Sequence, residues 1–181
     1  MGDILLRLYP IATNGTMAPT WYVLRSKPNK EEFFWGQLIA HLVEVYYPVI
    51  RAKAVNPRAH KDKPFLPGHL FINVNLQDNP PSFFDGLPGS RGLIMDDTGP
   101  VMVPDALIAA IRCRVDQINA TSGDETGGAP VDLDTVIQDR SLPGFTAIFD
   151  DCLSGNERVH RLYSLLRGEF VLEEMSGAVY N

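Results

Sequence analysis

The sequence predicts an α+β protein in which helices pack on a mostly antiparallel sheet. Runs rich in aromatic and β-branched residues, such as 21–25 and 70–76, are typical of strands bounded by turns. Two other segments, 31–45 and 105–118, carry apolar residues at helical spacing. The resulting order is strand, helix, four strands and helix, which favours helices layered on a single sheet.

The first strand and helix follow each other closely. Trp21–Arg25 reads as the first strand. Either Ser26 or Asn29 can cap the helix that follows, and its apolar spacing continues to about Val45. Tyr46–Ile50 is the predicted second strand, at a sheet edge because it contains a proline.

The middle of the chain supplies the remaining strands. Residues 51–63 are basic with little apolar periodicity, which indicates an exposed loop or a ragged hairpin. Leu70–Leu76 is predicted as a central strand, and 77–89 as a loop. Gly92–Met95 is a short strand, and Val101–Val103 pairs back with it across a turn.

Composition and charge divide the chain into parts. We expect an N-terminal extension at 1–19, a domain at 20–118, a glycine-rich linker at 119–132 and a small C-terminal module at 133–181. Up to residue 118 the chain has 12 Lys and Arg against 11 Asp and Glu, whereas the rest has 4 against 11. Two modules with different surfaces therefore follow, and the acidic tail disfavours binding to nucleic acid there.

The tail supports two interpretations. Phe145–Phe149 is typical of a strand, whereas Arg158–Leu166 fits a helix at least as well as a strand. About fifty residues form only a marginal core, so a partner surface could decide between the two.

Residues for catalysis or cofactor binding are not evident. Cys113 and Cys152 form neither a metal set nor a disulfide framework, so we expect free thiols in a reducing cytoplasm. The sequence shows no zinc set, phosphate-binding loop or nucleophile elbow. No apolar run approaches the ~20 residues of a membrane span. We therefore predict no enzyme, no cofactor, no metal and no membrane association.

Several motifs in order resemble the NusG family of transcription elongation factors. Trp21–Arg25, Pro64–Phe71, Ser90–Gly92 and Val103–Pro104 resemble its N-terminal domain. The tail segments Asp134–Ile137 and Leu142–Phe149 resemble its C-terminal KOW module, with details closest to the specialised paralogue RfaH.

This resemblance implies a monomeric, cytoplasmic antitermination factor that binds RNA polymerase. The polymerase partner is a coiled coil of its largest subunit, and the KOW module recruits a ribosomal protein or a termination factor. In RfaH that module switches between a β-barrel and a helical hairpin that masks the polymerase-binding patch. The residues expected to bind polymerase are Phe65, His69, Phe71, Phe83 and Phe84.

The same resemblance implies contact with the non-template DNA strand. The candidate residues are Lys27, Lys30 and Arg91, although a solvated charged face remains an alternative. Core packing remains an alternative for Phe71. The tail residues expected to form a barrel core or a domain interface are Phe145, Ile148, Phe149, Leu162, Leu165 and Leu166. A KOW-type RNA- or ribosome-binding protein is the alternative function.

Overall fold

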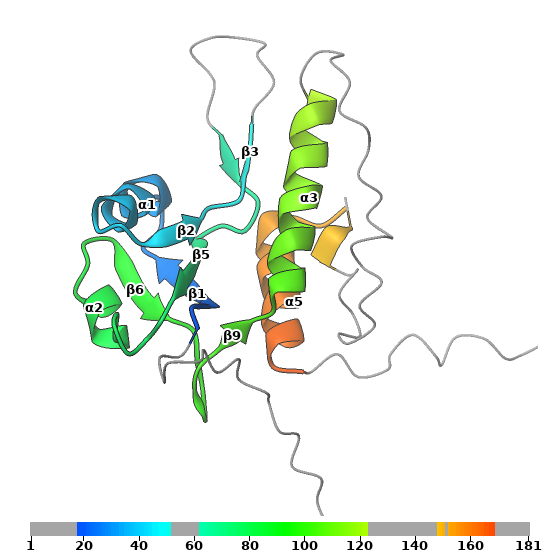
Figure 1. Ribbon diagram of the computed structural model, residues 1–181. Helices are drawn as coiled ribbons and strands as arrows, with labels where there is room; N and C mark the ends of the chain where they lie inside the picture. The colour runs from blue at the N-terminus through cyan, green and yellow to red at the C-terminus, as the bar shows by residue number, and fades with distance from the viewer. Residues whose placement is uncertain (1–17, 52–61, 123–147, 151, 169–181) are drawn as a thin grey trace, which may run out of the picture.

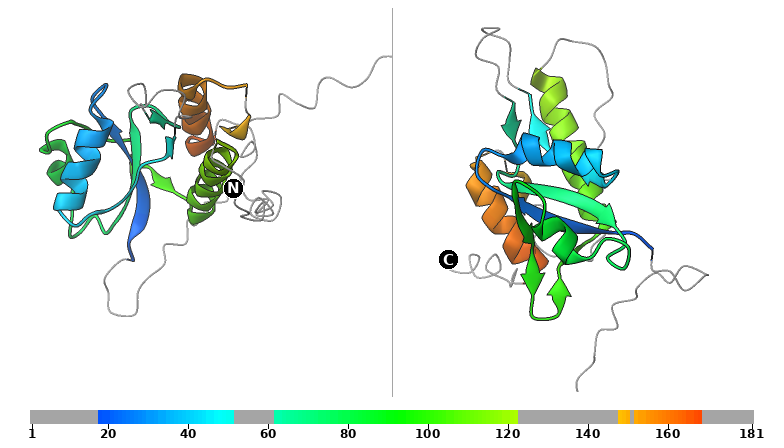
Figure 2. Two further views of the ribbon diagram at one scale, coloured as in Figure 1. Left: turned by 90° about the horizontal axis from the view of Figure 1, so that it is seen from above. Right: turned by 90° about the vertical axis from the view of Figure 1, so that its left-hand side faces the viewer.

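The computed structural model describes residues 18–51, 62–122, 148–150 and 152–168. A sheet forms its central layer, and helices cover both faces of this sheet (Figures 1 and 2). This arrangement confirms the predicted α+β class. The predicted linker, and the β-rich start of the tail that includes Phe145, lie largely outside the described residues.

The central sheet has five antiparallel strands. Its strands are β1 (Thr20–Ser26), β2 (Glu44–Tyr46), β5 (His69–Val74), β6 (Ser90–Leu93) and β9 (Met102–Val103). The order is β2-β5-β1-β6, and β9 also pairs with β1. β5 pairs with β1 along six residues, from Thr20 opposite Val74 to Arg25 opposite His69, which confirms that β5 is central.

Two short hairpins extend from this sheet. They are formed by β3 (Val49–Ile50) with β4 (Lys63–Pro64), and by β7 (Met95–Asp96) with β8 (Gly99–Pro100). The first closes the ends of the basic segment, whose residues 52–61 lie outside the described ranges. In the second, the Thr98 N–H donates to Asp96 Oδ1 at 2.7 Å, as expected for a tight turn.

Four helices are described. They are α1 (Glu31–Ala40), α2 (Pro81–Asp85), α3 (Asp105–Ser122) and α5 (Gly155–Leu166). α1 and α2 lie on one side of the sheet, and α3 and α5 lie side by side on the other (Figure 2). The sheet therefore has a separate helical cover on each face.

The predictions around α1 need correction. The helix ends at Ala40 rather than near Val45, because Leu42 takes a left-handed φ of 59° that stops it. Its N-cap residue is Lys30, whose side chain makes no capping hydrogen bond, so neither Ser26 nor Asn29 caps the helix. The predicted strand 46–50 is divided, with Pro48 between β2 and β3, because proline has no N–H for a ladder.

Other elements also differ from the prediction. The predicted strand Gly92–Met95 is divided between β6 and β7, and Met102–Val103 pairs with β1 rather than with that strand. The segment 77–89 contains the short helix α2, which begins at Pro81 because proline favours the first helical position. α3 continues to Ser122 rather than ending at Ile118. In the tail, α5 confirms the helical interpretation of 158–166.

The core is divided between the two faces of the sheet. Alternation along β5 sends Phe71 to one face, and Leu70 and Ile72 to the other. Leu70 and Ile72 pack with Phe34 and Leu38 of α1. Phe71 packs with residues from α3 and α5. The cluster that contains Phe71 is therefore built from both ends of the described chain.

Candidate functional site

The face of the sheet that carries Phe71 is apolar and contiguous. We call it the apolar sheet face and define it by Trp21, Val23, Phe65, Phe71 and Val103. The strand registers place Val23 opposite Phe71, and Trp21 opposite Val103. Neighbouring strands thus align large side chains in one continuous surface.

Helix α5 covers the apolar sheet face. Its side chains Leu162 and Leu165 are 0% and 5% exposed and belong to the same cluster as Phe65 and Phe71. The preceding residues Ile148 and Phe149 are also buried there, and Leu166 packs partly against them. The structure thus brings together the described members of the predicted tail set with two of the three aromatic candidates on the sheet.

The start of α5 is specified by a capping box. The Glu157 N–H donates to Ser154 Oγ at 3.3 Å, and the Ser154 N–H donates to Glu157 Oε2 at 2.7 Å. Hydrogen bonds from the side chain and backbone of Ser154 to the Glu157 carboxylate favour its charged form and lower the pKa of this carboxyl. The Ser-x-x-Glu spacing was the signal in the sequence that could have resolved the tail ambiguity.

Gly155 fits the first turn of α5 closely against the sheet. A Cβ atom at this position would lie 2.7 Å from Cγ of Pro67, in the turn that leads into β5. Such a separation is too short for two carbon atoms, so a side chain here would displace α5 or the turn. Gly155 was not among the interface residues expected from the sequence.

Two polar side chains of α5 reach the candidate binding residues directly. The Arg158 guanidinium lies over the Phe65 ring, 4.6 Å from its centroid. The hydroxyl of Tyr163 lies 3.0 Å from Nε2 of His69, and the two rings meet edge to face at 5.5 Å. Each of these α5 residues therefore contacts a residue that we expected to bind polymerase.

Helix α3 packs on the apolar sheet face beside α5. The guanidinium of Arg112 lies 5.3 Å from the ring centroid of Trp21 and 4.8 Å from that of Tyr46. Near the end of the helix, Asn119 Nδ2 donates to the Val49 carbonyl at 3.0 Å, and Asn119 Oδ1 accepts from the Arg51 N–H at 2.8 Å. α3 thus ties the β3–β4 hairpin to the domain.

The three candidate DNA-binding residues gather at one corner. Lys27, Lys30 and Arg91 are all exposed. The Lys27 N–H donates to the Gly89 carbonyl at 2.7 Å, and the Lys30 N–H donates to the Lys27 carbonyl at 3.1 Å. The Arg91 carbonyl accepts from Nη2 of Arg25 at 3.3 Å. The end of β1 and the start of β6 therefore present a common basic edge.

Phe83 and Phe84 both lie in α2, but they differ in burial. Phe84 is fully buried with the α1 side of the core, whereas Phe83 is only partly buried and meets the ring of His41 edge to face at 5.4 Å. Phe83 therefore presents part of its ring at the surface, and Phe84 supports it from inside. Of these two residues expected to bind polymerase, Phe83 therefore has the accessible ring.

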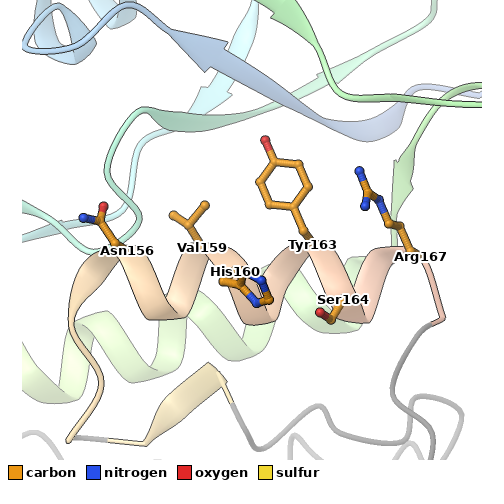
Figure 3. Close-up of a pocket in the computed structure, with 6 residues that line it drawn as sticks. All are labelled: Asn156, Val159, His160, Tyr163, Ser164 and Arg167. Carbon is orange, nitrogen blue, oxygen red and sulfur yellow. The ribbon is translucent and has the colours of Figure 1, made fainter.

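A pocket opens beside α5 (Figure 3). Its volume is about 440 Å³, and its lining residues from the described chain are Asn156, Val159, His160, Tyr163, Ser164 and Arg167. Figure 3 shows Tyr163 pointing from α5 toward the strands. Within the described residues, no group of three or more His, Cys, Asp or Glu side chains could hold a metal ion.

Among the helices in the described parts of the chain, none is long and apolar enough to cross a bilayer.

The chain matches the model of one known protein family. The family model described as transcription termination factor NusG matches residues 19–112, just over half of the 181 residues. The chain belongs to the NusG family, and the matched region contains β1 to β9 and the first part of α3. This is a family of transcription factors and not of enzymes, in agreement with the expectation from the sequence.

Among solved structures, the chain is similar to one titled "Domain interaction in Thermotoga maritima NusG". The two are 19% identical with a TM-score of 0.43, and the match covers 62% of this chain. The chain matches 63% of the length of that structure. No curated protein sequence matches this chain significantly.

Proposed function

We propose that this protein is an RfaH-like transcription elongation and antitermination factor held in a masked state by α5. Family membership supports a role in transcription. One observation supports the masked state: Leu162 and Leu165 of α5 occupy the apolar sheet face, together with Phe65 and Phe71. An aromatic surface of this kind suits docking of a helical tip, because large rigid side chains dominate such interfaces.

In this proposal the polymerase and α5 compete for one surface. Release of α5 uncovers Phe65, His69 and Phe71, which then bind a coiled coil of the largest polymerase subunit. Phe83 lies on the other side of the sheet, packed against the α1 cluster, and supplies a second contact with the enzyme. Polymerase bound in this way is held in a pause-resistant state.

The basic corner supplies the DNA contact. Lys27, Lys30 and Arg91 lie on adjacent backbone segments, so one strand of nucleic acid can pass all three. The partner is the non-template strand of the transcription bubble, bound through phosphates and, by Arg91, a base edge. DNA binding at particular operons would restrict the factor to those targets.

The tail would act a second time after release. Residues 133–181 carry the resemblance to a KOW module, and we propose that they recruit a ribosomal protein or a termination factor in the cytoplasm once α5 has left the sheet. A switch of this kind requires two packings within a few kcal/mol of each other.

Retention of core RNA polymerase tests the function. Immobilised full-length chain is compared with Leu162→Ala, which removes a buried side chain and should weaken α5 docking by ~2–5 kcal/mol. We expect more polymerase on this variant than on the wild type. Arg161→Ala, a change at the exposed neighbour, is the matched control and should behave as wild type.

A second substitution makes the result specific to the apolar sheet face. Adding Phe65→Ser to Leu162→Ala should remove the gained retention, because Phe65 then no longer fills an apolar pocket of the partner. Circular dichroism checks that each variant stays folded. Failure of both the wild type and Leu162→Ala to retain polymerase at moderate salt would refute the proposed function.

A further inference from the structure

The contact between His69 and Tyr163 joins the sheet to α5 through a titratable pair. His69 is 8% exposed, and its two ring nitrogens both have partners. Nδ1 lies 2.7 Å from the Pro67 carbonyl oxygen, and Nε2 lies 3.0 Å from the Tyr163 hydroxyl. One bond stays within the β5 turn, and the other crosses to the tail helix.

These two bonds assign the protons. A carbonyl oxygen can only accept, so Nδ1 of His69 must carry the hydrogen that it shares with Pro67. Nε2 of the neutral ring then has a lone pair, and the Tyr163 hydroxyl donates to it. The arrangement fits neutral imidazole. If Nε2 of His69 were also protonated, its N–H and the Tyr163 O–H would both point into the contact as donors, so the hydroxyl hydrogen would have to turn away.

The charges around His69 come from each neighbouring element. Arg25, its partner on β1, disfavours a second positive charge, whereas Glu31 of α1 favours one. On the other side of the contact, Arg25, Arg91 of β6 and Arg167 after α5 all act on Tyr163. Burial of His69 and the nearby Arg25 both disfavour a histidinium at this junction, and Glu31 only partly opposes them.

We propose that His69 is an acid-sensitive latch: its neutral ring accepts a hydrogen bond from Tyr163 and holds α5 on the sheet, and its protonation releases α5. The biological consequence rests on the proposed function, since release would uncover the apolar sheet face for polymerase. The latch itself concerns only the closed and open forms of this chain, and its test needs no polymerase.

The direction of the pH effect follows from burial. Burial lowers the pKa of His69 below its ordinary value of 6.5, and the nearby Arg25 acts in the same direction, while the Pro67 carbonyl and Glu31 oppose it. In the open form the ring is exposed and titrates normally. The closed form therefore keeps its full stability above about pH 6.5 and loses up to tenfold in population ratio per pH unit below it, until the lowered pKa is reached.

Hydrogen exchange of the full-length chain measures this ratio. Protection of the α5 amides, corrected for the intrinsic exchange rate, is followed from about pH 8 to about pH 5, the range in which histidines titrate. The amides of β1 and β5 report on the rest of the domain. We expect α5 protection to fall up to tenfold per pH unit below about 6.5, and strand protection to change much less.

Two matched variants assign the effect to one ring. His69→Gln cannot titrate, so its α5 protection should be lower at neutral pH but independent of pH. His160→Gln removes an exposed histidine from the same helix and should respond as the wild type does. A flat profile in the wild type, or an unchanged acid response in His69→Gln, would overturn the proposal.

A direct titration covers the case in which His69→Gln fails to fold. The ring signals of His69 in the wild-type chain, followed by NMR, should move at a pH below the ordinary range for histidine. Titration of His69 at or above its ordinary pKa would also overturn the latch. Loss of polymerase retention with an intact acid response would refute the proposed function and leave the latch standing.

Discussion

Tyr163 is the α5 residue whose hydroxyl reaches the sheet. It donates to His69 at 3.0 Å while its ring edge rests on the imidazole. Tyr163→Phe removes the hydroxyl and keeps the ring, so it separates the hydrogen bond from the packing. Because a buried acceptor loses its donor, we expect α5 docking to weaken by about 1 kcal/mol, close to a fivefold loss of protection. Hydrogen exchange at pH near 8 measures this.

The control for Tyr163→Phe is a substitution at the next residue, Ser164. Ser164→Ala removes a hydroxyl that lines the pocket, and none of the described hydrogen bonds links it to the sheet. We expect its α5 protection to equal that of the wild type. Equal protection in Tyr163→Phe would mean that ring packing alone holds this end of α5.

At the basic corner, individual charges set the strength of DNA binding. Lys27 and Arg91 are exposed and lie on neighbouring segments. If each contacts a phosphate, Lys27→Gln and Arg91→Gln should each lower the slope of log affinity against log salt by roughly 0.7 for single-stranded DNA. Fluorescence anisotropy with a labelled single strand measures the slopes. Arg161→Gln, an exposed change on α5, should leave them unaltered.

Among the elements, α5 depends on a glycine for its docking. Ala is a better helix former than Gly by up to ~1 kcal/mol, so Gly155→Ala should strengthen an isolated helix. In the folded chain the new methyl group would stand 2.7 Å from Pro67 Cγ and push α5 away. We therefore expect α5 protection to fall despite the better helix propensity. Asn156→Ala changes an exposed side chain one residue later and is the control.

A rise in α5 protection in Gly155→Ala would contradict this expectation. It would mean that the turn at Pro67 yields easily and that helix propensity dominates. The comparison distinguishes a helix fitted to the sheet from a helix that merely rests on it.

The elements differ in how well the sequence predicts them. β1 and β5 follow from their runs of aromatic and β-branched residues, because strands that are largely buried on both faces favour such runs. The end of α1 was missed, because apolar residues continue past the helix into β2 while the stop depends on the positive φ of Leu42. Such a stop usually calls for glycine, so nothing in the residue type predicted it.

The candidate site shows the same contrast. The aromatic character of Phe65 and Phe71 was visible in the sequence, whereas their burial under a tail helix was one of two alternatives that the sequence left open. Periodicity left the tail open between helix and strand, although the capping-box spacing of Ser154 and Glu157 favours the helix. The partnership of His69 with Tyr163 spans 94 positions in the sequence, so no local pattern could have predicted it.

At the scale of the whole molecule, the two faces of one sheet have different covers. α1 and α2 arise from the chain between the strands, so they remain attached to their face whatever the tail does. α5 comes from the far end of the chain and shares the other face of the sheet with α3. Its removal would uncover the part of the apolar sheet face that lies beside α3, while α3 and the α1 face keep the domain folded. This asymmetry makes a masked binding surface compatible with a stable domain.

Competition for one surface imposes a reciprocal relation. If polymerase and α5 occupy the same face, a polymerase coiled coil must lower α5 protection by the same factor by which α5 lowers its affinity. Adding a helical hairpin fragment of the largest subunit to the full-length chain should therefore expose the α5 amides and protect the turn at Pro67. Leu162→Ala should bind the same fragment more tightly, because less of it is closed. Hydrogen exchange with and without fragment measures both effects. Full protection of α5 in the bound complex would place the polymerase elsewhere on the molecule, because no closed form could leave the apolar sheet face free.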